Sequence, residues 1–194
     1  MAQQNKKIHE VIVITLSEEG EAHAAPMGIT EVDGQIVIQP FKPSATYNNL
    51  KQHRQCTVNF TDDVRVFAGA LTGRRNWPTL PCLQIECQYL EQALSHIELE
   101  LTDFEDSDPR AKFTGSIITE VTHASFRGFN RAQNAVIEAA VLSSRLQMLP
   151  AEKIQQEIDY LKIAIDKTAG DNELEAWGWL MDKIEKHGIA LTND

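Results

Sequence analysis

Hydroxyl and amide side chains gather at one place in the chain, in the segment KPSATYNNLKQHRQ. Ser44 or Thr46 can cap a short helix that runs from there to about His53. The N-terminus of a helix offers free backbone N–H groups and a partial positive charge, which suit a phosphate group. Ser44, Thr46, Tyr47 and Asn48 therefore predict a phosphate-binding site, and a capped surface helix without a ligand is the alternative.

Two consecutive arginines, Arg74 and Arg75 in LTGRRNW, could supply the positive charge that a phosphate dianion requires. The guanidinium group presents a planar fork of N–H donors that matches the geometry of phosphate oxygens. The alternative is an exposed basic turn that binds nothing. The spacing of the residues is compatible with both interpretations.

The patterns of several common catalytic and metal sites are absent from the sequence. It contains no GxGxxG after a strand, no GxxxxGK(S/T), no GxSxG and no HExxH, so the corresponding nucleotide, hydrolase and zincin sites are not expected. Cys56, Cys82 and Cys87 lack CxxC spacing, which favours core or strand positions over a disulfide framework or a zinc ribbon. The six histidines are dispersed and form neither HxxxH nor HxH, so we expect no metal site. No side chain stands out as a catalytic acid or base.

The composition limits the class of protein and of partner. With 194 residues, of which 42% are apolar, the chain can form a real core. A net charge of −10 repels phosphate backbones, so we expect no nucleic acid partner. No apolar run approaches the roughly eighteen residues that a membrane helix needs. The N-terminal MAQQNKKIHE lacks an apolar signal core, and we therefore expect a cytoplasmic protein.

The first part of the chain has the alternation and the β-branched content that are typical of strands. We predict strands at residues 8–16, 24–32, 35–41, 56–60, 83–90, 96–102 and 113–124. Asp33-Gly34 accepts the positive φ angles of a type I′ turn and predicts a hairpin. In HIELELT the apolar side chains face one side and Glu98 and Glu100 the other, which predicts a half-solvated antiparallel strand. Short connections without βαβ alternation favour an antiparallel barrel, because closure removes exposed edges.

The sequence changes to a helical pattern near residue 130. Apolar residues at helical spacing predict a first helix from Ala132 to Leu146, and Pro150 begins a second one that Gly170 ends. Asp171 can cap a third helix, with Leu174, Trp177, Met181 and Ile184 inward and Gly188 at its end. We therefore predict an α+β protein with a β-barrel over residues 1–128 and a C-terminal helical subdomain over residues 129–194.

The motifs AAPMGI, TYNNL and VNF resemble those of the flavin split-barrel proteins, which include the flavin reductase-like and pyridoxamine-phosphate-oxidase-like groups. Together with the tail segment NRAQNAVIEAAVLSSRL, they resemble more closely the family of domain of unknown function 447. That resemblance extends over roughly residues 8–190, and the tail segment is its more specific part.

The resemblance implies an antiparallel split β-barrel that binds FMN, usually as a homodimer with the flavin near the subunit interface. Ser44, Thr46, Tyr47 and Asn48 would then hold the phosphate, whereas Arg74 and Arg75 match no motif of the family. Asn59 would lie near the flavin wall. The strand residues that would run along the isoalloxazine edge are Ala24, Ala25, Pro26, Met27 and Gly28.

Residue chemistry on this strand is compatible with that role. The small alanine and glycine side chains let a ring approach the strand, and Pro26 cannot donate a ladder hydrogen bond, which fits an edge or bulge that faces a ligand. The alternative is a simple bend of the barrel. For the function we expect an FMN-binding protein, possessing flavin-dependent oxidoreductase activity on an unknown substrate. A non-catalytic flavin carrier or sensor, and an interaction protein without a cofactor, are the alternatives.

Overall fold

The computed structural model describes residues 7–189 and 191, and the chain divides into two compact units. The first unit comprises residues 7–61 and 77–125, and the second comprises residues 62–76 and 126–191 as far as they are described. The second unit therefore takes up the C-terminal helices together with one internal segment that follows the strand ending at Phe60.

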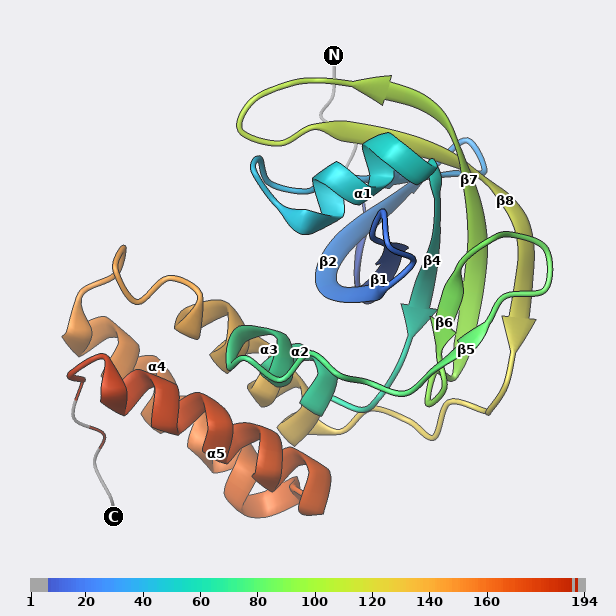
Figure 1. Ribbon diagram of the computed structural model, residues 1–194. Helices are drawn as coiled ribbons and strands as arrows, with labels where there is room; N and C mark the ends of the chain where they lie inside the picture. The colour runs from blue at the N-terminus through green and yellow to red at the C-terminus, as the bar shows by residue number, and fades with distance from the viewer. Residues whose placement is uncertain (1–6, 190, 192–194) are drawn as a thin grey trace. The chain divides into compact units, whose positions relative to one another are not determined.

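The first unit contains a closed antiparallel barrel, as the sequence predicts (Figure 1). Its strands follow the order β1-β2-β3-β8-β7-β4 around the barrel. Their bounds are β1 Ile8–Leu16, β2 Ala22–Val32, β3 Gln35–Ile38, β4 Gln55–Phe60, β7 Ser95–Glu105 and β8 Lys112–Thr122. The helix α1 (Ala45–His53) lies between β3 and β4 in the chain and inserts Leu50 into the barrel core.

The hairpin between β2 and β3 forms where Asp33-Gly34 predicts it. Asp33 has a φ of 52° and Gly34 a φ of 74°, the two positive angles that a type I′ turn requires. β1 pairs with β2 along its whole length, whereas β3 pairs with β2 only from Ile29 to Val32. Within the described part of the chain, the segment Ala22–Gly28 of β2 thus has a strand on one side only.

The predicted strand over residues 83–90 is wrong in its extent. Only Gln88–Leu90 is extended, as β6, and it pairs with β5 (Thr79–Pro81) in a separate two-stranded sheet. The backbone N–H groups of Leu83 and Gln84 donate to the carboxylate of Glu98 at 2.9 and 2.8 Å. Residues 82–87 therefore form a connection shaped by a tertiary contact rather than a continuous strand.

The prediction that Glu98 faces solvent is also wrong. His96 and Glu98 project from the outer face of β7, and both side chains are buried. The β5–β6 hairpin covers this face, since the Thr57 hydroxyl of β4 donates to Gln88 O at 2.7 Å and the Tyr89 ring stacks on His96. The outer face of β4 and β7 is therefore a buried polar layer, while Glu100 stays exposed as expected.

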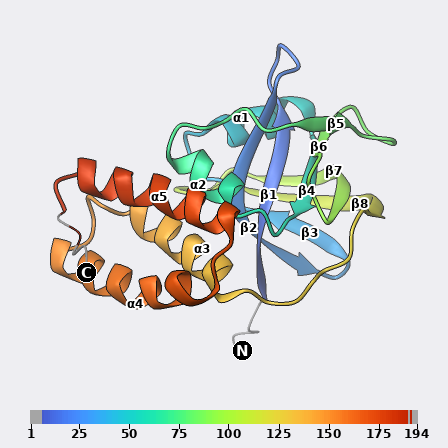
Figure 2. The same ribbon diagram turned by 90° about the horizontal axis from the view of Figure 1, so that it is seen from below.

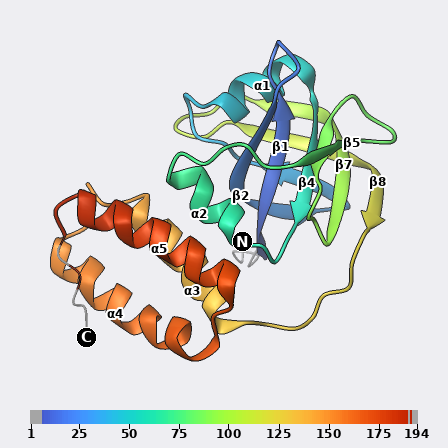
Figure 3. The same cartoon turned by 60° about the horizontal axis from the view of Figure 1, so that its bottom comes forward.

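The second unit consists of α2 (Arg65–Leu71), α3 (Arg131–Ser143), α4 (Ala151–Thr168) and α5 (Asp171–Lys186). The three tail helices confirm the predicted ones, and α2 is an addition. α3 contacts both α4 and α5 (Figures 2 and 3). Among residues 7–189, no helix combines the length and the apolar character that crossing a membrane requires.

Two details of α5 differ from the prediction. Leu174 is exposed rather than inward, and Leu180 lies in the core instead. The N-cap is Gly170, not Asp171, because the Gly170 N–H donates to the Glu173 carboxylate at 2.9 Å. The long side chain of Glu173 thus reaches back to the cap, and Asp171 becomes the first helical residue.

Candidate functional site

The N-terminus of α1 has the features that the sequence predicts for a phosphate site. Ser44 is the N-cap, and its hydroxyl accepts a hydrogen bond from Tyr47 N at 3.2 Å, while its carbonyl accepts one from Asn48 N at 3.1 Å. The N–H groups of Ala45 and Thr46 have no acceptor among the described residues. No acidic residue lies in the first turn. The positive end of the helix dipole is therefore available to an anion.

Thr46 adds an observation that the sequence could not provide. The residue is only 2% exposed, yet its hydroxyl has no hydrogen-bond partner among the described residues. The hydroxyl oxygen is not among the fully buried side-chain atoms that lack a partner, so it keeps some contact with solvent and is accessible to a ligand. A ligand that accepts from this hydroxyl would replace its bond to water.

Tyr47 and Asn48 differ in their surroundings. Asn48 is exposed and accessible to a ligand. The Tyr47 hydroxyl donates to Asp106 at 3.1 Å, and its ring packs edge-on against Phe113. Tyr47 thus has a partner of its own within the barrel unit, and its hydroxyl must leave Asp106 in order to reach a phosphate.

A compact ion cluster lies beside Tyr47. Lys42 Nζ is 2.6 Å from Asp106 and 2.9 Å from Asp108, and it stands 5.4 Å from the centre of the Tyr47 ring. The bond from Lys42 holds the pKa of Asp106 below its usual value, and the two carboxylates raise the pKa of Lys42. The amino-acid pattern does not reveal this cluster, because Lys42 and the two aspartates lie more than sixty positions apart in the chain.

The strand β2 presents a row of half-buried residues from Ala24 to Met27, followed by the exposed Gly28. They pair with β1 alone, from Ile14↔Ala24 to Glu10↔Gly28. Gly28 also has a packing role, because a Cβ there would come within 2.8 Å of the Ile8 side chain. α1 contacts both β1 and β2, and the Asn49 side chain donates to the Thr15 hydroxyl at 2.9 Å. The structure thus brings the helix and the one-sided strand into the same unit.

The structure places Asn59, the residue expected near the flavin wall, in a buried position of the barrel unit. It is fully buried, and its amide nitrogen donates to Ile12 O at 3.1 Å and to the Thr57 hydroxyl at 3.0 Å. Its amide oxygen accepts from Leu90 N at 2.8 Å. Asn59 therefore links β1, β4 and β6 through its side-chain hydrogen bonds.

Arg74 and Arg75 belong to the second unit. The Arg74 guanidinium stacks over the Trp179 ring at 4.2 Å and donates to the Thr72 hydroxyl at 3.0 Å, and both Arg74 and Arg75 are exposed. Arg74 lines an open pocket of about 320 Å³ within this unit, together with Leu71, Thr72, Trp179, Asp182, Lys183 and Lys186. The structure thus gives Arg74 partners inside the helical unit.

Solved structures with a similar fold include two that are described as FMN-bound or FMN-binding. An FMN-bound DUF447 protein from Methanosarcina mazei aligns with a TM-score of 0.78 and 21% identity, over 92% of this chain and 96% of that chain. An FMN-binding protein from Thermus thermophilus aligns with a TM-score of 0.52 and 15% identity, over 62% of this chain and 74% of that chain. A 2-nitrobenzoate 2-nitroreductase from Pseudomonas fluorescens aligns with a TM-score of 0.51 and 20% identity, over 63% of this chain and 67% of that chain. These alignments confirm the predicted split-barrel fold.

Sequence comparison agrees with the fold. No curated protein matches the chain. The family model for the N-terminal domain of the protein of unknown function DUF447 matches residues 9–124, and the second DUF447 model matches residues 130–182. The chain therefore belongs to the DUF447 family, as the motifs AAPMGI, TYNNL and VNF predict.

Proposed function

We propose that this protein binds FMN in the barrel unit, with the phosphate at the N-terminus of α1. The observation that carries the proposal is the N-terminus of α1, where the N–H groups of Ala45 and Thr46 have no acceptor among the described residues and the Thr46 hydroxyl beside them forms no hydrogen bond there. Ser44 and Asn48 complete the set of neutral donors around this helix end. The FMN-bound family member from Methanosarcina mazei, which aligns over most of the chain, supports FMN as the ligand.

We further propose that the isoalloxazine ring lies along Ala24–Gly28 of β2. The ring is flat and largely apolar and needs an apolar wall and a few backbone partners. The one-sided pairing of this segment leaves backbone groups without a strand partner, and its alanines and glycine are small. The proposed flavin site does not include Asn59, whose amide is fully used in hydrogen bonds within the barrel unit. It does not include Arg74 and Arg75 either, which belong to the helical unit.

The first experiment is a comparison of FMN with riboflavin, which lacks the phosphate. We expect the purified protein to carry flavin absorbance or to acquire it on titration with FMN. Because the helix N-terminus and several hydrogen bonds act on the phosphate, riboflavin should bind at least about 100-fold more weakly, roughly 2.7 kcal/mol. A colourless protein that FMN cannot reconstitute overturns the proposal, and equal affinity for both flavins overturns the phosphate assignment.

Replacement of Thr46 by valine tests the hydroxyl itself. Valine has nearly the same shape, so the apo protein should be about as stable as the wild type, because the hydroxyl forms no hydrogen bond within the described residues. FMN affinity should fall about tenfold, as expected for one hydrogen bond to a charged group. Thermal unfolding of the apo protein and fluorescence titration with FMN measure the two effects. A parallel loss of stability and affinity would contradict the assignment.

The proposed reaction class is flavin-dependent oxidoreduction, since bound FMN supplies hydride and electron chemistry at its N5. The nitroreductase among the similar structures favours this class over a flavin carrier. Rapid reduction of the bound flavin by NADH or NADPH supports the enzyme. Absence of reduction by NADH, by NADPH and by reduced deazaflavin supports the carrier.

We also propose that the protein forms a homodimer, because Ile8, Ile117 and Ile118 of the barrel unit are exposed apolar side chains. The three cysteines are free, which supports a reducing, cytoplasmic setting.

A further inference from the structure

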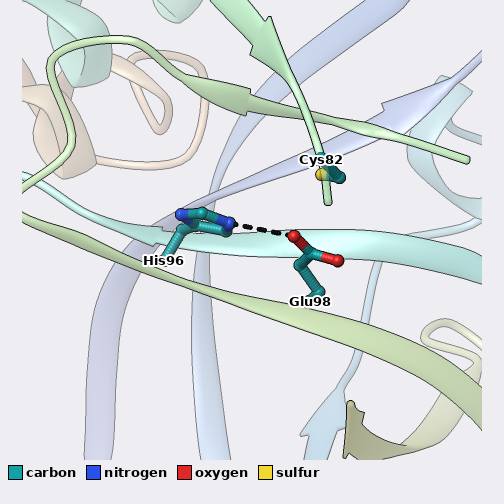
Figure 4. Close-up of side chains that lie close together, drawn as sticks. All are labelled: Cys82, His96 and Glu98. Atoms are coloured by element: carbon teal, nitrogen blue, oxygen red, sulfur yellow. Dashed lines mark hydrogen bonds and ion pairs between the residues drawn. The ribbon is translucent and has the colours of Figure 1, made fainter. Parts of the chain in front are cut away.

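A second polar cluster lies under the β5–β6 hairpin, apart from the residues proposed for FMN. Figure 4 shows that His96 and Glu98 project side by side from β7, while Cys82 comes from the chain just after β5. One ligand atom from each of the three residues lies within 4.8 Å of the other two. Thiolate, imidazole and carboxylate together form a donor set typical of zinc and related divalent metals.

Glu98 is the unusual member of the cluster. Its carboxylate is fully buried, and no lysine or arginine of the described chain forms an ion pair with it. Burial would raise the pKa of Glu98, but the N–H groups of Leu83 and Gln84 and the contact with His96 outweigh this effect and hold the pKa below its usual value. Buried carboxylates are normally paired with a cation or coordinate a metal. The Glu98 carboxylate therefore accepts hydrogen bonds but has no lysine or arginine beside it among the described residues.

The distance between His96 and Glu98 also favours a bound cation. His96 Nε2 lies 3.4 Å from Glu98 Oε1, longer than the roughly 2.7–3.2 Å of a normal N–H···O bond. Metal–nitrogen and metal–oxygen bonds of about 2.1 Å at a tetrahedral angle separate the two donor atoms by about 3.4 Å. The observed separation matches the one that two ligands of a single ion would have, so the pair could accept an ion with little rearrangement.

The surroundings hold the donor atoms in place. His96 Nδ1 lies 2.8 Å from His123 Nε2, and in the tautomer in which Nδ1 donates to His123, Nε2 is the nitrogen that can bind a metal. Tyr89 stacks on His96 with ring centres 4.2 Å apart and on His123 at 4.9 Å. Burial lowers the pKa of His96, which keeps the imidazole neutral. Such contacts of the non-coordinating ring nitrogen orient metal-binding histidines in many sites.

We propose that Cys82 Sγ, His96 Nε2 and the Glu98 carboxylate bind one divalent metal ion of the zinc class, with a fourth position open to water or a small ligand. Three protein ligands with one open position are typical of catalytic rather than structural zinc sites. Cys82 is half-buried, which gives an ion a route to the otherwise buried pair. Binding converts the Cys82 thiol to a thiolate and releases its proton to solvent.

Two other roles of Cys82 fit the structure less well. As a nucleophile, Cys82 would need a lowered pKa, but its hydrogen bond to Cys87 raises the pKa of the thiol. A metal held by the thiol pair Cys82 and Cys87 would not use the buried carboxylate. The experiment therefore separates the proposed ligands from the thiol pair.

The test is titration of the metal-free, reduced full-length protein with Co²⁺ and, by competition, with Zn²⁺. We expect one ion per chain, a thiolate-to-cobalt charge-transfer band and d–d bands of tetrahedral intensity. Cys82→Ser should abolish the charge-transfer band, and His96→Gln and Glu98→Gln should each weaken binding at least about 100-fold. His123→Ala, which removes the contact with His96 Nδ1 and the ring stacking but none of the proposed ligands, should weaken it about 10- to 100-fold. FMN titration of Cys82→Ser should be unchanged, so that this test is independent of the proposed flavin site.

Cys87→Ser is the matched control, since it removes the neighbouring thiol and keeps the three proposed ligands. Binding by this variant should stay within about threefold of the wild type. Loss of binding in Cys87→Ser would overturn the three-ligand site, and so would retention of the thiolate band in Cys82→Ser. Absence of cobalt binding by the folded wild type would overturn the proposal as a whole. Circular dichroism of every variant distinguishes loss of ligand from loss of fold.

Discussion

Replacement of Ala45 by glutamate is expected to lower the affinity for FMN by at least about 100-fold while the apo protein stays folded. Ala45 is exposed at the first position of α1, and the first turn contains no acidic residue. A carboxylate there interacts favourably with the helix dipole, by about 0.3–1 kcal/mol, so the apo protein should be slightly more stable. The same carboxylate repels a phosphate dianion, and like charges about 4 Å apart near a protein surface repel by several kcal/mol.

Ala45→Gln is the control for this experiment because it adds the same bulk without charge. Its FMN affinity should remain within about fivefold of the wild type, and riboflavin should bind both variants equally. Fluorescence titration at two salt concentrations completes the measurement, since added salt screens part of the repulsion in Ala45→Glu. Unchanged FMN affinity in Ala45→Glu would show that the phosphate lies elsewhere.

Replacement of Asn59 by alanine should lower the free energy of unfolding of the barrel unit by about 3–5 kcal/mol. The substitution leaves the buried Leu90 N–H without its acceptor and removes the donors to Ile12 O and Thr57. Each buried group that loses its partner costs about 1–3 kcal/mol, and a small cavity adds to the loss. The effect should be largest where the β5–β6 hairpin meets the barrel.

Hydrogen exchange gives this effect a local measurement. The Leu90 amide should lose most of its protection in Asn59→Ala, while amides of β1 and β2 lose less. Asn48→Ala is the control, because Asn48 is exposed and its replacement should change stability by less than about 0.5 kcal/mol. If Asn59→Ala were as stable as the control, the side chain would not be the tie that its three hydrogen bonds indicate.

The sequence by itself determined the local features of this protein. Asp33-Gly34 set the hairpin, Ser44 set the start of α1, and the 3.6-residue periodicity set the three tail helices. These features depend on interactions between residues close in the chain, such as a cap or a turn with positive φ, so the residue types alone specify them. The closed barrel follows from the same strands because closure leaves few backbone groups without a strand partner, and Ala22–Gly28 of β2 is the segment that keeps one free side.

Only the tertiary structure decided which polar side chains are buried and what they contact. Alternation along β7 placed Glu98 opposite the core face, but it could not show that the hairpin from residues 79–90 covers that face. In the same way, VNF marked Asn59 as notable, and the structure made it a buried tie. Thr46 acquires its isolated hydroxyl, and Cys82 meets His96 and Glu98, only through contacts between segments that are distant in sequence. Periodicity defines the two faces of a strand, whereas the burial of the second face depends on where the rest of the chain packs.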